Sequence, residues 1–170
     1  ADMSGGTVGT LTTTGKITQL SGTGKVNAMT GGEITTMMGG DVIAMSNGTV
    51  KTLNNGKITT VTGGNVTIMN GGEITNLNGG NVDAMTDGNI KTIDGGIVTD
   101  MSGGLIGTLK TGGITNMSGG TVTSMIGGLI TTMTNGVVTS ITGGEIRTLN
   151  GGVVTAMGGG KVTNLIAGEI

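Results

Sequence analysis

The sequence predicts an all-β, rod-like β-helix, and three observations carry that prediction. An eight-residue unit repeats without a spacer: residues 30–69 run TGGEITTM, MGGDVIAM, SNGTVKTL, NNGKITTV, TGGNVTIM. Glycine makes up 39 of the 170 residues, and proline, Phe, Trp and Tyr are absent, so the large aromatics of an ordinary core are missing. Ile, Val, Leu and Met recur at a fixed period, which indicates stacked repeats rather than one globular core.

Within the unit, whose eight positions we number from 1, apolar side chains occupy fixed places. Position 5 is always Ile or Val, and position 8 is always Met, Leu, Ile or Val. Positions 4 and 6 admit charges, which marks them as outward. Neighbouring strand residues point to opposite faces, so we expect a strand over positions 4–7, with positions 5 and 7 inward and position 8 folded under the corner. Position 7 is small, for example Ala28, Thr36, Ala44, Thr92, Ser124 and Ala156.

The corner between strands depends on glycine at position 3, which has no exception in the chain. Position 2 also admits Asn47, Asp87 and Ala167, among others. Position 3 therefore requires a backbone conformation closed to other residues, or a place without room for a Cβ atom. We expect Gly80→Ala to destabilise the protein far more than Gly79→Ala.

The whole chain, residues 1–170, forms one repetitive β-helix shaft of about 21 octapeptide units. Residues 1–29 are slightly irregular, because the units 12–20 and 21–29 are each one residue longer than the rest; after Met29 the register never slips. The chain starts and stops in the middle of the pattern, so we expect it to belong to a longer shaft.

The size of one coil stays open between two arrangements. Three units per coil make a triangular cross-section, which we prefer because positions 5, 7 and 8 give a wide interior wedge. Two units per coil make a flattened coil. An echo in position 8 favours the second: a methionine recurs in every second unit, at Met69, Met85, Met101, Met117 and Met133. Either cross-section closes the backbone ladder, in one chain or in three interleaved chains.

Octapeptide repeats of this kind resemble the intertwined triple-stranded β-prism of phage cell-puncturing needles, type VI secretion spikes and phage tail-fibre shafts. The unit here carries Gly-Gly where those needles favour a single glycine. The resemblance implies a homotrimeric structural protein of a virion, partnered by neighbouring tail or fibre proteins and reaching a host surface only through parts outside this chain. The alternative is a secreted single-chain β-solenoid: an adhesin stalk, a self-assembling filament or an ice-binding protein.

Composition argues against most chemistry. There is no His and no Cys, so the usual zinc and transition-metal ligands and the commonest general base are missing. We expect no enzyme, no catalytic, cofactor-binding or metal residues, and no cofactor. The net charge of −2 lacks the footprint of a nucleic-acid-binding protein. No apolar run approaches the roughly 20 residues of a membrane span.

Several local motifs are weaker than they look. The stretch 21–26, SGTGKV, lacks the first Gly and the last Ser or Thr of a phosphate-binding loop. Asp87 and Asp94 lie near corners but do not recur, unlike the aspartates of a calcium-binding β-roll. Threonine at position 6 suits strands and also suits ice binding. The sequons at Asn47, Asn65 and Asn116 carry no weight in so Asn- and Thr-rich a chain.

For the outer surface and the core we make three further predictions. Glu145 pairs with Arg147 along one strand. Asp83 pairs with Lys91 if their units stack. Val82 and Met85 are buried, whereas Asn81 and Asp83 face solvent.

Overall fold

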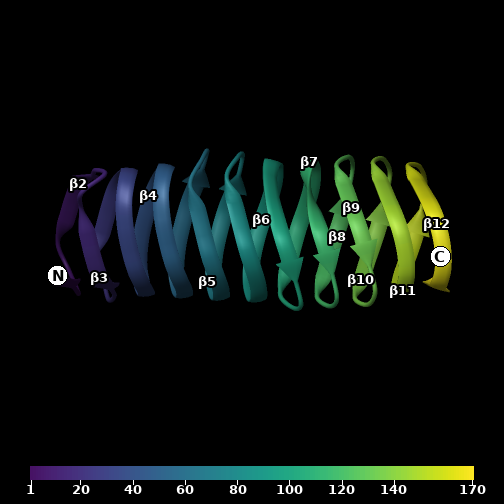
Figure 1. Cartoon of the computed structure of the whole chain (residues 1–170), viewed down its shortest axis with the longest axis horizontal. Coiled ribbons are helices and arrows are strands. Elements are labelled where there is room, and N and C mark those ends of the chain that lie inside the picture. The colour runs from purple at the N-terminus through teal and green to yellow at the C-terminus, as the bar shows by residue number, and fades with distance from the viewer.

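The computed structural model covers residues 1–170 and contains strands but no helix. The chain winds as a flattened spiral from its N-terminus at one end to its C-terminus at the other (Figure 1). Every strand pairing is parallel. The strands are β1 (Asp2–Met3), β2 (Thr7–Leu11), β3 (Lys16–Leu20), β4 (Lys25–Val61), β5 (Asn65–Leu77), β6 (Asn81–Met101), β7 (Leu105–Met117), β8 (Thr121–Met125), β9 (Leu129–Met133), β10 (Val137–Ile141), β11 (Glu145–Met157) and β12 (Lys161–Glu169).

One coil takes two octapeptides, so the expected triangular coil of three octapeptides is wrong. Thr49 pairs with Asn65, Asn65 with Asn81, and Asn89 with Leu105, and each partner lies two units further along the chain. The rod has about ten such turns. The chain is a parallel β-solenoid that satisfies its backbone ladder by itself.

Alternate units form two broad faces, which we name after one exposed residue on each. The Ile97 face holds the segments 16–20, 33–37, 49–53, 65–69, 81–85, 97–101, 113–117, 129–133, 145–149 and 161–165. The Leu105 face holds the segments 7–11, 25–29, 41–45, 57–61, 73–77, 89–93, 105–109, 121–125, 137–141 and 153–157.

The core contains positions 5 and 8 of the units, and the expectation that position 7 points inward is wrong. All 36 core residues occupy positions 5 or 8, and Val82 and Met85 are fully buried as predicted. Position 7 lies at the surface, half-buried or exposed, at Ala28, Thr36, Ala44, Thr92, Ser124 and Ala156. The ladder explains the departure from strict alternation, because position 6 is passed over in the paired register, as at Lys51 between the pairs Val50–Val66 and Thr52–Ile68. Two successive residues thus face outward, and the larger position 8 side chain is the one buried.

The two longer units enlarge the first coils without disturbing the ladder. Thr7 pairs with Lys25 across both long units, and Lys16 pairs with Glu33 across one of them. The extra residue is absorbed in the corner, where the Gly15 amide donates to the Thr12 carbonyl at 2.8 Å and the Gly24 amide to the Ser21 carbonyl at 3.0 Å. The irregularity predicted for residues 1–29 is thus confined to the two corners that contain Gly15 and Gly24.

Position 3 is reserved for glycine for both of the predicted reasons. At a typical corner Gly80 has φ +73°, a left-handed conformation. Gly96 lacks a positive φ, yet a Cβ there would collide with Leu77 Cγ. Methionine at position 8 fills the space beneath the next coil's corner, since a Cβ on Gly104 would meet Met85 Cε at 2.6 Å. The position 8 side chain is therefore folded under a corner, as the sequence suggested.

Candidate functional site

The outer surface of the rod is built from rows of side chains that repeat once per coil. Positions 4, 6 and 7 point out of each face, and a residue at position 4 lies beside position 6 of the next coil. Asn65 Nδ2 donates to Asp83 Oδ2 at 2.7 Å, and Thr99 Oγ1 donates to Asn81 Oδ1 at 3.2 Å by this rule. Polar contacts on the rod therefore run along its length.

An ion-pair ladder lies on each face, centred on a glutamate at position 4 that pairs with a lysine at position 4 of the preceding coil and a lysine at position 6 of the following coil. On the Ile97 face, Glu33 is bound by Lys16 of the preceding coil and Lys51 of the following coil, each at 2.8 Å. On the Leu105 face, Glu73 lies 3.0 Å from Lys57 and 3.2 Å from Lys91. Each ladder joins three successive coils.

These contacts change the titration of the two carboxyl groups. Hydrogen bonds from Lys16, then Lys51 and Thr35, lower the pKa of Glu33 from its ordinary 4.5 to about 2. The bond from Lys57 is the largest of the causes that lower the pKa of Glu73, and Lys91 and Thr75 add to it. Because the pKa of each glutamate is lowered, both are ionised at neutral pH, and each ladder there joins opposite charges.

The predicted Glu145–Arg147 pair is absent, and the condition for the Asp83–Lys91 pair is not met, because their units do not stack. Asp83 and Lys91 are one unit apart, which is half a coil, so they lie on opposite faces; Lys91 binds Glu73 instead. Asp83 accepts amide hydrogens from Asn65 and Asn81. Glu145 accepts the Thr163 hydroxyl hydrogen, and no ion pair joins it to Arg147. Asn81 and Asp83 lie on the outer surface as predicted, although both are half-buried.

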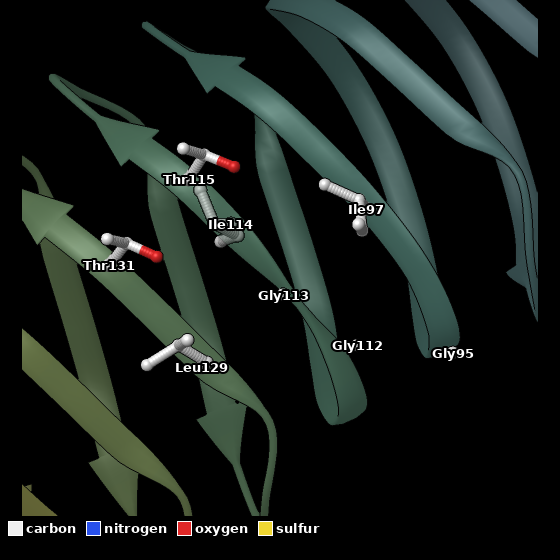
Figure 2. Close-up of a pocket in the computed structure, with 8 residues that line it drawn as sticks. All are labelled: Gly95, Ile97, Gly112, Gly113, Ile114, Thr115, Leu129 and Thr131. Carbon is white, nitrogen blue, oxygen red and sulfur yellow. The ribbon is translucent and has the colours of Figure 1, made fainter.

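One hollow interrupts the Ile97 face, and it is the feature that sequence reasoning missed. Figure 2 shows Ile97 and Leu129 on either side of the strand that carries Gly113, with Ile114, Thr115 and Thr131 around the opening. The hollow measures about 210 Å³. It exists because position 4 of this coil is Gly113, so the row Ile97, Gly113, Leu129 has a gap in its middle. Position 4 compared across every second unit would have revealed it.

The surroundings of this hollow are apolar. Ile97 is 47% exposed, and Ile126, at the adjoining corner, is 49% exposed. Residues 111–144 contain no charged side chain. Asp83 and Arg147 are the position 6 charges nearest to the hollow along the Ile97 face, two coils before and two coils after Gly113.

The motifs set aside in the sequence stay apart in space. The stretch 21–26 forms the corner closed by the Gly24–Ser21 bond, and Asp87 accepts a bond from its neighbour Gly88. Asp94 accepts the Thr111 hydroxyl at the opposite edge of the rod from Asp87. Asn65 and Asn116 use their amides on Asp83 and Asp100. No cluster of three or more His, Cys, Asp or Glu residues that could hold a metal ion is present.

The threonine rows are short. Along position 6, the longest uninterrupted runs are Thr99, Thr115 and Thr131 on the Ile97 face and Thr123, Thr139 and Thr155 on the Leu105 face.

Comparison of the chain with protein-family models, curated proteins and solved structures found no match. The class of protein is thus given by the fold alone, a two-faced parallel β-solenoid. The structure contains no helix long and apolar enough to cross a membrane.

Proposed function

We propose that the chain is a rigid, rod-like shaft, a structural segment without catalysis that holds the parts joined to it a fixed distance apart. The unbroken core of 36 buried side chains from Leu11 to Val154 carries this proposal. Each coil packs on the next with no deep cleft between them, so the rod has length and stiffness but no enclosed site. Stability of such a stack is approximately a sum of coil terms and neighbour terms, which suits a part whose length is its function.

The setting we propose is outside a cell, as the shaft of a phage tail fibre or spike, or as the stalk of an adhesin. The octapeptide resemblance supports the first, although the chain completes each coil alone, without two partners. Both settings need a thin rod that keeps its shape, and neither needs a reactive group.

The interleaved homotrimer and the single-chain rod differ in length. At about 4.8 Å per coil, ten coils give a rod of about 48 Å. Three interleaved chains with one octapeptide of each per rung would give a needle of roughly 100 Å. The ladder closed within one chain supports the shorter rod.

Small-angle X-ray scattering measures this difference directly. The length of the particle separates the two arrangements, because side-by-side association of rods widens the particle without lengthening the rod. We expect a particle about 50 Å long, as the strand spacing multiplied by the number of coils requires. A needle twice as long would overturn the single-chain shaft, and a flexible-chain profile would overturn a rigid shaft of either kind.

A further inference from the structure

On the Ile97 face, the side chains before and after the Gly113 coil are arranged symmetrically about that coil, and the Leu105 face has no such arrangement. Around the coil of Gly113, an apolar residue lies one coil away on each side, Ile97 and Leu129. Two coils away at position 6 lie opposite charges, Asp83 before and Arg147 after. Asp83 is half-buried, Arg147 is exposed, and Arg147 takes part in no ion pair within the chain.

From this arrangement we infer that the Ile97 face binds a second copy of the same chain, with the two rods side by side and antiparallel. A two-fold axis along the strand of Gly113 keeps each strand position opposite itself and reverses the order of the coils. It therefore brings Ile97 of one copy onto Leu129 of the other, and Asp83 of one copy onto Arg147 of the other. Each contact occurs twice, as an isologous interface demands.

Position 4 of the three central coils is apolar, whereas position 7 there is polar, with Asp100 of one copy opposite Thr132 of the other. Two Ile97–Leu129 contacts flank two facing Gly113 residues, so the two hollows of about 210 Å³ face each other across the axis. Burying apolar surface at these contacts stabilises the pair. The Asp83–Arg147 contacts at the rim fix the direction and the register, since one coil of slip would place both charges opposite threonine.

The Leu105 face offers no such match. The charge nearest to Leu105 on that face is Lys91, which is already bound to Glu73. At position 4 of the preceding coil lies the neutral Asn89. The hollow also has no counterpart there, because Thr121 follows Leu105 in the same row. Leu105 is 39% exposed and gives a matched control on the other side of the rod.

The size of the contact predicts weak, reversible pairing. Five coils of about 4.8 Å and strands of five residues cover roughly 400 Å² on each copy, or roughly 800 Å² in total. That total lies below the range of standard stable interfaces, so we expect dissociation in the micromolar to millimolar range.

Sedimentation equilibrium over that range tests the pairing and its charges. We expect a monomer–dimer equilibrium in which Arg147→Asp raises the dissociation constant at least about tenfold, because like charges then meet twice. The double variant Asp83→Arg/Arg147→Asp restores the pairing, because each contact again joins opposite charges. Leu129→Ser weakens the dimer, whereas Leu105→Ser leaves it unchanged; circular dichroism confirms that all variants stay folded.

A cysteine cross-link tests the geometry, since the native chain contains no cysteine. Thr115 lies at position 6 of the Gly113 coil, on the two-fold axis, so Thr115→Cys should form a disulfide with its own copy under mild oxidation. Thr123→Cys, on the Leu105 face, should not. A monomer at millimolar concentration, a charge swap that fails to restore pairing, or equal cross-linking at both sites would each overturn the inference. A trimer mass would overturn it together with the single-chain shaft, whereas loss of pairing alone leaves the shaft unaffected.

Discussion

Substituting Gly79 and Gly80, the two glycines of one corner, separates the effect of a left-handed backbone conformation on stability from the effect of steric contact. Gly80 has φ +73°, and a Cβ built on it would lie 2.6 Å from the Gly64 carbonyl oxygen and 3.0 Å from the Gly63 carbonyl carbon. Both neighbours are backbone atoms of the preceding coil and cannot rotate away. The left-handed conformation costs a non-glycine residue on the order of 1–3 kcal/mol, and overpacking adds about 1–3 kcal/mol. Gly80→Ala should therefore cost about 2–6 kcal/mol.

Gly79 gives the matched comparison, and the structure tempers the sequence-based expectation for it. Its φ is ordinary, yet a Cβ would lie 2.5 Å from the Thr62 carbonyl oxygen, so Gly79→Ala is not harmless. Corners with asparagine at position 2 avoid this contact in another conformation: Gly56, after Asn55, has φ +92°, and its amide is bonded to Asn55 Oδ1 at 2.8 Å. Gly79→Asn can adopt that corner and should cost less than about 1.5 kcal/mol.

Thermal and urea unfolding of the three variants, followed by circular dichroism, measures the difference. A loss of about 1 kcal/mol lowers the midpoint by about 2–4 °C in a chain of this size, so Gly80→Ala should lower it by about 4–24 °C and Gly79→Asn by only a few degrees. Equal shifts for Gly80→Ala and Gly79→Asn would refute the assignment of position 3 as the strained position.

Two further predictions concern the core and the ladders. Met85→Ala should cost about 2–5 kcal/mol, because it leaves a cavity beneath Gly104, whereas Met38→Ala, at a methionine 47% exposed, should change the unfolding midpoint little; similar losses for both would refute the assigned interior. The pKa of Glu33 is lower in the folded state, so its contribution to stability is complete above pH 4.5 and is lost as the pH falls towards about 2. Glu33→Gln should flatten that part of the profile of midpoint against pH, and an unchanged acid limb would contradict it.

The repeat itself made the strands, the corners and most of the core predictable. Invariant glycine at position 3 and invariant apolar residues at positions 5 and 8 are local requirements, and the structure uses them as such at Gly80, Val82 and Met85. Position 7 was misassigned because strict strand alternation was applied across a residue that the ladder passes over. Side-chain size predicts burial better here, because the large position 8 residues such as Met85 are buried and the small position 7 residues such as Ala84 are not.

The coil size could not be settled by the unit alone, because every octapeptide carries the same inward pattern. Information on the coil resides in differences between units. The methionines at Met69, Met85 and Met101 do stack in one column of the Ile97 face, so their recurrence in every second unit was the true signal. The lysine–glutamate ladders carry it too, since Lys57 and Glu73 occupy position 4 of successive coils and Lys91 occupies position 6 of the coil that follows.

The absence of aromatic side chains gives a physical reason for the flattened coil. Two packed sheets lie about 10 Å apart, a gap that Ile, Val, Leu and Met from both faces fill without a void. A triangular coil of three octapeptides places its three faces around a wider centre, and aliphatic chains of this length would leave that centre underpacked, at a cost that grows with cavity volume. The chain instead buries two aliphatic positions per octapeptide and extends methionine tips beneath the next corner, as Met85 does under Gly104. Replacing several position 8 residues with phenylalanine would overfill this narrow core rather than widen it, so the composition and the two-sided coil depend on each other.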